Sequence, residues 1–213
     1  MKLYLSSYKL GNKPQELIKL IGDNKRAAII MNAQDLLTPE RRSIRLQEEI
    51  DALTGLGLQP EELDLRDYFG KADELAKAIE QYGVLWVRGG NVFVLRRAMK
   101  QSGFDAAAIP LIRSERLVYA GFSAGSCAAS PDLRGIELVD DAEAVPEDYA
   151  TEKIWYCMNL IPYSIAPHYR SPHPESEAVQ EVVKYLKAND IAYKTLHDGE
   201  AIVIDGDNER VVG

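Results

Sequence analysis

The fold of this chain is decided by residues 118–126, Val118-Tyr119-Ala120-Gly121-Phe122-Ser123-Ala124-Gly125-Ser126. An apolar run typical of a buried strand leads into Gly-x-Ser-x-Gly, and small residues that suit the start of a helix follow it. In such a turn the serine takes a strained backbone conformation, and the two glycines let the strand and the helix approach each other. The stretch therefore predicts a strand, a sharp turn and a helix, with Ser123 presented at the turn as a nucleophile.

Short apolar runs alternate with amphipathic stretches on either side of this turn, which is typical of βα units and a largely parallel sheet. We expect an α/β fold, a three-layer sandwich with a mostly parallel central sheet, formed by a single domain over residues 1–213. The predicted strands cover residues 3–6, 27–31, 62–64, 84–87, 117–121, 191–194, 201–204 and 210–212. The predicted helices cover residues 14–21, 39–56, 71–82, 91–102 and 174–189. The irregular segment 131–167 is expected to wrap around the site.

The composition is that of an ordinary globular protein, with 46% hydrophobic and 27% charged residues. The net charge of -8 would repel a phosphate backbone, so nucleic acid is not expected as a partner. No run approaches the roughly 18 consecutive apolar residues of a membrane span, and the N-terminal residues lack the pattern of a signal peptide. We expect a cytoplasmic protein without a membrane partner, in which Cys127 and Cys157 are reduced.

A serine nucleophile needs a neighbouring base, and the chain has 3 histidines. His168 ends the apolar run 163–167, where a strand would carry it to the carboxyl edge of the sheet, at which the nucleophile is also expected. His173 lies between two prolines and is interpreted as a solvated loop residue. His197 directly precedes Asp198, and adjacent residues on a strand point to opposite faces, so it is the second choice. We favour His168 as the base.

The acid that orients the base is expected at the turn before the strand 201–204, where both Asp198 and Glu200 stand. Asp198 is preferred because the following Gly199 fixes its position tightly. The order serine, histidine, acid along the chain differs from that of the α/β-hydrolases, in which the acid precedes the histidine. The sequence therefore disfavours that family.

Backbone amides that can hold a developing negative charge are expected at two turns. One amide belongs to Ala124, the residue after the nucleophile. The other is expected from the turn Arg88-Gly89-Gly90-Asn91, which follows an apolar strand and begins a helix. The two turns together predict an oxyanion hole.

These segments together resemble the peptidase E (α-aspartyl dipeptidase) family of serine peptidases, whose fold is similar to that of class I glutamine amidotransferases. The resemblance extends over nearly the whole chain and is carried by residues 86–91, 121–125 and 166–169. It implies that no metal ion or organic cofactor is needed. The residues it implies are a triad of Ser123, His168 and Asp198, with Gly90 and Ala124 as oxyanion donors.

The resemblance also implies a short peptide as substrate, with aspartate at the N-terminus for the known activity of the family. Arg170 is expected to bind such a substrate, because a guanidinium group pairs with a carboxylate through two hydrogen bonds. Asn91, which closes the glycine turn, is expected to bind it as well. The segment 169–177 differs from the loop of the aspartate-specific members, so the side chain that the substrate carries is left open.

Two alternatives stand beside this hypothesis of an exopeptidase that forms an acyl-enzyme on Ser123. One is a catalytically silent binding or regulatory member of the fold, because a fold does not determine a function. The other is an amidase or esterase with the same triad. A homodimer is compatible with the sequence, which leaves the oligomeric state open.

Overall fold

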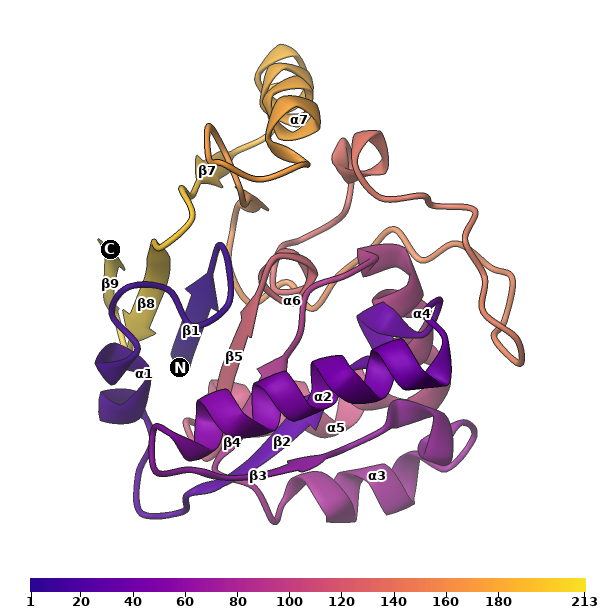
Figure 1. Cartoon of the computed structure of the whole chain (residues 1–213), viewed down its shortest axis with the longest axis vertical. Coiled ribbons are helices and arrows are strands. Elements are labelled where there is room, and N and C mark those ends of the chain that lie inside the picture. Colours follow the sequence, from indigo (N-terminus) through magenta and orange to yellow (C-terminus); the bar gives the residue numbers. More distant parts are fainter.

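The computed structural model describes residues 1–213. The strands of its central sheet are β1 (Lys2–Ser6), β2 (Arg26–Ile30), β3 (Gln59–Glu62), β4 (Val84–Val87), β5 (Val118–Phe122), β8 (Ala201–Asp205) and β9 (Asn208–Val212). They lie in the order β3-β2-β4-β5-β1-β8-β9 (Figure 1). The strands from β3 to β1 in this order are parallel, whereas β8 pairs with β1 and with β9 in antiparallel fashion.

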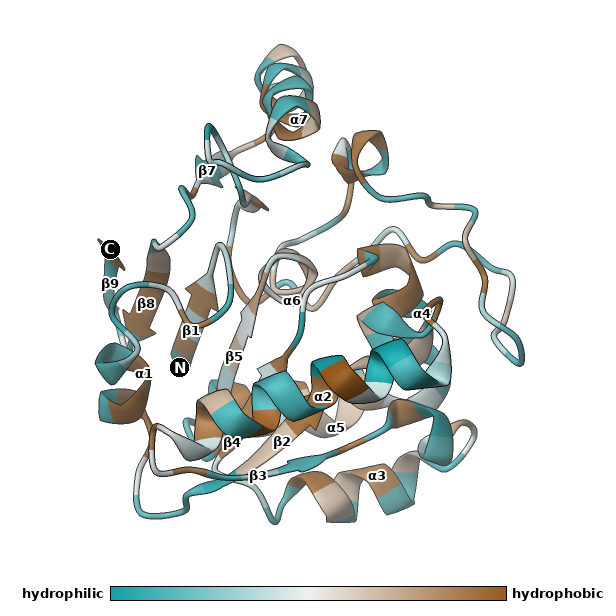
Figure 2. Ribbon diagram, in the orientation of Figure 1, coloured by the Kyte–Doolittle hydropathy of each residue, from teal (hydrophilic) through white to brown (hydrophobic).

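Helices cover both faces of this sheet. On one face α1 (Gln15–Leu20) and α2 (Pro39–Thr54) pack over buried side chains such as Tyr4 and Trp86. On the other face α3 (Ala72–Ile79), α4 (Val92–Ser102), α5 (Phe104–Arg113) and the short α6 (Ala124–Cys127) pack over a larger apolar cluster. Most of the inner strands are mainly apolar, whereas β3 at the edge is polar (Figure 2). The predicted three-layer α/β sandwich is confirmed.

A second, smaller sheet pairs β6 (Ser164–Ala166) with β7 (Tyr193–Thr195) in parallel. It lies beside α7 (Ser176–Ala188), and three short 3-10 helices complete the chain: η1 (Asn32–Gln34), η2 (Leu65–Tyr68) and η3 (Ile136–Leu138). The expectation that the strand before His168 joins the central sheet was wrong. Both sides of β1 are already paired, with β5 and β8, so β6 finds its partner in β7 instead.

Two further elements differ from the prediction. The strand predicted at residues 62–64 lies at 59–62. This edge strand, β3, consists of polar residues, so the apolar pattern used for the prediction indicated the segment that follows it. The helix α5 was not predicted, and it contains Pro110. Its buried side chains, among them Phe104 and Ile112, pack into the core and hold it in place.

None of the helices combines the length and the apolar character that a membrane span requires.

The turn between β5 and α6 packs closely against the end of β4. A Cβ atom on Gly125 would lie 2.1 Å from the carbonyl oxygen of Val87, and one on Gly121 would lie 2.6 Å from the same atom. No side chain fits at either position, so both residues are glycine for lack of space. This packing brings the nucleophile turn to the carboxyl end of β4.

We expect Gly125→Ala to lower the free energy of unfolding by more than about 3 kcal/mol, because β4 and α6 must separate to admit the methyl group. Gly22→Ala is the matched control, since a Cβ atom there meets nothing within 4 Å, and its change should stay below about 1 kcal/mol. Urea unfolding followed by circular dichroism measures both variants. Equal stabilities would contradict the close packing.

Candidate active site

Ser123 lies between β5 and α6 with a φ of 50° and a ψ of -117°. This conformation is strained for a residue with a side chain, and the surrounding structure must hold it. The Ser123 amide donates to the carbonyl oxygens of Ser6 (3.3 Å) and Ser7 (3.2 Å), and its carbonyl oxygen accepts from the amides of Ser126 and Cys127, both at 2.9 Å. These bonds fix the turn at the carboxyl edge of the sheet.

His168 and Asp198 are joined by a hydrogen bond of 2.7 Å between Nδ1 and Oδ1. The Ser7 hydroxyl accepts from the amide of His168 (2.8 Å) and donates to Asp198 Oδ1 (2.9 Å). The amide of Asp198 in turn donates to Ser171 Oγ at 2.8 Å. A carboxylate at Nδ1 favours the tautomer that carries its proton there, which leaves Nε2 free to accept a proton.

Ser123 lines two cavities of different size, and the larger cavity brings the predicted residues together. Ser123, His168, Asp198 and Gly90 all line it, and the centre of a water molecule can occupy about 410 Å³ of its space. The other polar or charged side chains around it are Tyr8, Gln34, Arg45, Arg88, His173 and Glu175.

The glycine turn after β4, residues 88–91, packs closely against Ser123. A Cβ atom on Gly89 would lie 2.9 Å from the Cβ atom of Ser123. Gln34 Nε2 donates to the carbonyl oxygen of Gly89 at 2.5 Å, and because the peptide is trans, the amide of Gly90 points the opposite way. The amides of Gly90 and Ala124 take no part in the backbone hydrogen bonds of loops and turns. Both are therefore available as oxyanion donors.

A buried ion pair braces this turn from α2. Arg88 Nε donates to Glu49 Oε1 at 2.9 Å, and Trp86 Nε1 donates to the second oxygen of Glu49 at 2.7 Å. Arg45, which also extends from α2, is half-buried and has no ion pair within the chain. The larger cavity therefore contains an arginine whose charge is free to meet a ligand.

The ring of His173 stacks on that of His168, with 3.6 Å between the ring centroids and 8° between the planes. The interpretation of His173 as a solvated loop residue was therefore wrong. The chain folds back sharply here, with positive φ values at His168 (60°) and Arg170 (51°), which returns His173 to the site. Burial lowers the pKa of His168 below its ordinary value of 6.5, and His173 lowers it further, although Asp198 raises it.

Two residues expected to bind substrate lie outside this cavity. Arg170 is exposed, and its guanidinium group lies over the ring of Tyr169 at 5.1 Å. Asn91 caps α4, because its side-chain oxygen accepts from the amide of Val94 (3.0 Å) and its Nδ2 donates to the carbonyl oxygen of Asp141 (2.9 Å). The side chain of Asn91 thus holds the segment around residue 141 against the start of α4.

The second choices for base and acid also lie apart from the cavity. The ring of His197 lies near Tyr169, and the carboxylate of Glu200 accepts from the amide of His197 at 2.7 Å. Glu200 therefore serves the turn before β8, whereas Asp198 contacts His168.

The sequence reasoning missed Ser7, Arg45 and Glu175. A signal existed for Ser7, which follows β1, because polar residues just beyond neighbouring parallel strands gather at one edge. Arg45 and Glu175 reach the cavity from the middle of α2 and from the loop before α7, and no local pattern indicates this.

A metal site is a further candidate, because His168, His173 and Glu175 offer ligand atoms within 4.8 Å of one another. The two imidazole rings are almost parallel, however, so a single ion could not lie close to the plane of both. Imidazole nitrogens bind metals through lone pairs in the ring plane. The stacked arrangement therefore fits a role of His173 in lowering the pKa of His168 better than a role in metal binding.

We expect the Ser123→Gly variant to be more stable than Ser123→Ala by about 1 kcal/mol, because glycine adopts this conformation without strain. The gain is reduced by the greater freedom of glycine in the unfolded chain. Urea unfolding of the two variants gives the difference. A more stable alanine variant would show that the turn is not strained.

We expect His173→Ala to raise the pKa of His168, since the variant removes the stacked imidazole that lowers this pKa and admits water to the ring. His197→Ala is the control and should leave this pKa unchanged. An NMR titration of the imidazole resonances measures both. A fall in the pKa of His168 upon removal of His173 would contradict the assigned cause.

The family model of peptidase family S51 matches residues 11–212. Peptidase E of Streptomyces coelicolor is 31% identical over 156 residues, which are 71% of this chain and 60% of that protein. Peptidase E of Pasteurella multocida is 30% identical over 151 residues, which are 67% of this chain and 59% of that protein. The aligned part of this chain thus spans about 60% of the length of these relatives. A Drosophila melanogaster protein assigned as an alpha-aspartyl dipeptidase is 25% identical over 179 residues, 80% of this chain and 70% of that protein.

Solved structures agree with the family model. A protein assigned as a peptidase E in Listeria monocytogenes EGD-e superposes with a TM-score of 0.78 and 26% identity, covering 99% of this chain and 97% of that one. A peptidase from an acI-B1 actinobacterium shares the fold, with a TM-score of 0.72, 16% identity, and coverage of 100% and 87%. Because the family model covers nearly all of the sequence, this chain belongs to peptidase family S51, as its resemblance to peptidase E predicted.

Proposed function

We propose that this chain is a serine peptidase that hydrolyses short peptides, with residues 1–213 as its catalytic domain. Ser123 is the nucleophile, His168 is its base, and Asp198 orients the base. The observation that carries the proposal is the 2.7 Å contact between His168 and Asp198 in the cavity that the strained Ser123 turn lines. Membership of a family of peptidases supports it.

The proposed reaction passes through an acyl-enzyme. His168 Nε2 takes the proton of Ser123 Oγ as this oxygen attacks the peptide carbonyl, and the amides of Gly90 and Ala124 hold the oxyanion. His168 then gives the proton to the departing amine. In the second half of the reaction His168 takes a proton from a water molecule that attacks the ester carbonyl, and it returns this proton to Ser123 Oγ as the acid product leaves. Asp198 stabilises the imidazolium that forms in each step.

The charges of the larger cavity support a short peptide as substrate. Arg45 and Arg88 line it, and Arg45 has no partner within the chain. A guanidinium group at this place suits the C-terminal carboxylate of a dipeptide, whose leaving residue must lie near Ser123. The low pKa of His168 supports the chemistry too, because a base must be unprotonated at neutral pH.

A fluorophosphonate probe tests the nucleophile. We expect it to label Ser123 in the natural chain and not in Ser123→Ala, and we expect Asp198→Asn to slow the labelling by about 10³- to 10⁴-fold because the tautomer of His168 is lost. Because the pKa of His168 is lowered below 6.5, the labelling rate should fall to half its maximum only at a pH below 6.5. Mass spectrometry of the adduct measures these rates.

His197→Ala is the control and should label at the natural rate. Absence of an adduct, under conditions that label another serine hydrolase, would favour the silent binding or regulatory member of the fold. An amidase or esterase would label as well, and a panel of dipeptides, amides and esters separates it from a peptidase. A cytoplasmic location and a homodimer stay predictions from the sequence.

A further inference from the structure

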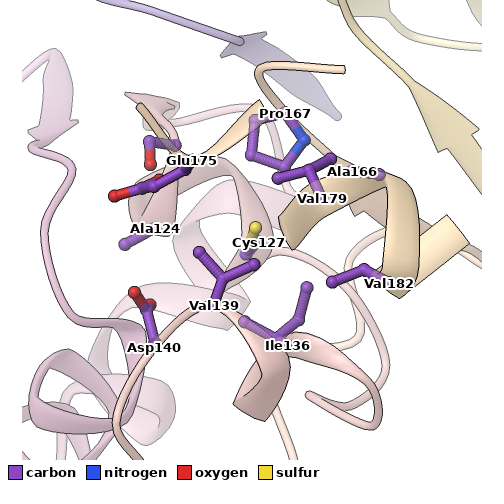
Figure 3. A pocket seen from close by; sticks show the side chains of 11 residues that line it. Ala124, Cys127, Ile136, Val139, Asp140, Ala166, Pro167, Glu175, Val179 and Val182 are labelled. Atoms are coloured by element: carbon purple, nitrogen blue, oxygen red, sulfur yellow. The ribbon is translucent and has the colours of Figure 1, made fainter. Parts of the chain in front are cut away.

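A second, narrower cavity reaches Ser123 between α6, the end of β6, the η3 segment and α7 (Figure 3). The centre of a water molecule can occupy about 20 Å³ of it, which is room for about one ordered water. Much of its wall is apolar, and this part includes Cys127, Ile136, Val139, Ala166, Val179 and Val182. Ser123 and Ala124 line this cavity too, but the proposed reaction gives its other residues no role.

Two carboxyl groups, those of Asp140 and Glu175, belong to the same cavity. In Figure 3 their oxygens lie on one side of it, and the apolar side chains of Ile136 and Val182 lie on the other. Asp140 Oδ2 accepts from the amide of Val92 at 2.7 Å, which fixes its position. Burial raises the pKa of Asp140 to about 7, and Glu175 adds to the rise.

No lysine or arginine lines the narrow cavity. Glu175 Oε2 lies 4.0 Å from the imidazole nitrogens His168 Nε2 and His173 Nδ1, whereas Asp140 has no ion pair. The cost of holding negative charge at the partly buried Asp140 is therefore not offset. An ammonium group between Asp140 and Glu175 would offset it. The narrow cavity is thus better suited to a cation than to an anion.

The larger cavity differs from the narrow one in having two guanidinium groups, although Asp198 and Glu175 line it as well. Arg45 and Arg88 line only that cavity and Asp140 lines only the narrow one, whereas Ser123 and Glu175 line both. The nucleophile therefore lies between the guanidinium group of Arg45, which has no ion pair, and the carboxyl groups of Asp140 and Glu175. A free dipeptide has the matching distribution, with an ammonium group at one end and a carboxylate at the other.

Covalent geometry connects the narrow cavity to the N-terminal residue of such a substrate. The carbonyl carbon that Ser123 attacks is two bonds from the α-nitrogen, and the side chain of the same residue begins on the carbon between them. When the carbonyl group is at Ser123, the ammonium group and this side chain must both lie next to it. The narrow cavity borders Ser123 and offers carboxylates and a small apolar space.

We propose that the α-ammonium group of the substrate's N-terminal residue takes the place of the one water molecule for which the narrow cavity has room, at Asp140 and Glu175, and that the uncharged side chain of the same residue, no larger than a methyl group, lies against the apolar wall. The inference rests on the proposed function and names its substrate class, peptides that begin with a residue such as alanine. An N-terminal aspartate is disfavoured, because its side chain would bring a further negative charge into a cavity without a cation.

Binding to the Ser123→Ala variant tests this without turnover. Isothermal titration is carried out with Ala-Ala, Asp-Ala and N-acetyl-Ala-Ala. We expect Ala-Ala to bind at least about ten-fold more tightly than the other two, because one lacks the ammonium group and the other adds a carboxylate. Equal affinities for Ala-Ala and N-acetyl-Ala-Ala, or a preference for Asp-Ala, would overturn the proposal.

Substitutions in the narrow cavity test which of its residues determine the affinity for free dipeptides. In the Ser123→Ala background we expect Glu175→Gln to weaken Ala-Ala by about ten-fold and to leave N-acetyl-Ala-Ala unchanged. Glu177→Gln is the matched control, because Glu177 is exposed on α7 and lines neither cavity. Val139→Ala enlarges the space and should improve the binding of Leu-Ala relative to Ala-Ala. Equal effects of the two glutamine variants would exclude the assigned site.

The experiments distinguish a failure of the proposed peptidase chemistry from a failure of the proposed role of the narrow cavity. If the fluorophosphonate labels Ser123 but free dipeptides bind without the expected selectivity, the nucleophile stands and the assignment of the narrow cavity is wrong. If Ser123 is not labelled but Ala-Ala binds selectively and depends on Glu175, the cavity is assigned correctly and the peptidase chemistry is wrong.

Discussion

The carbonyl oxygen of Val87 sets the geometry on which the rest of the site depends. Gly121 and Gly125 both pack against it with no space for a side chain, which brings the turn at Ser123 onto the end of β4. Because Val87 is also the last residue before the glycine turn, the same contact fixes the spacing between the nucleophile and the amide of Gly90. A strained serine persists here because three elements hold it together.

The base and the acid come from a different part of the fold, and Ser7 connects that part to the sheet. Its hydroxyl bonds both His168 and Asp198, which are separated from it by 161 and 191 positions. Hydrogen bonds to a charged group contribute about 1.5–3 kcal/mol each, so this small network is strong enough to keep the two residues in register. The end of β1 thereby joins the small sheet and the turn before β8 to the nucleophile.

Sequence analysis predicts those parts of the structure that a local pattern of residues determines. The strand, turn and helix around Ser123 have a glycine signature, and the inner strands are apolar enough to be recognised. The edge strand β3 was misplaced because its side chains are polar, and the helix α5 was missed because it contains Pro110. Contacts between distant segments leave no local pattern, which is why the stacking of His173 on His168 appeared only in the structure.

The start of α4 is shared by two parts of the site. Its first amide holds Asp140, its cap Asn91 holds the neighbouring backbone, and Gly90 immediately precedes it. A ligand that shifts the segment around Asp140 would therefore also shift the start of α4 and the preceding Gly90, whose amide is the proposed oxyanion donor. Discrimination between substrates would then be expressed in the turnover rate and not in affinity alone, because an ill-fitting residue disturbs the group that stabilises the transition state.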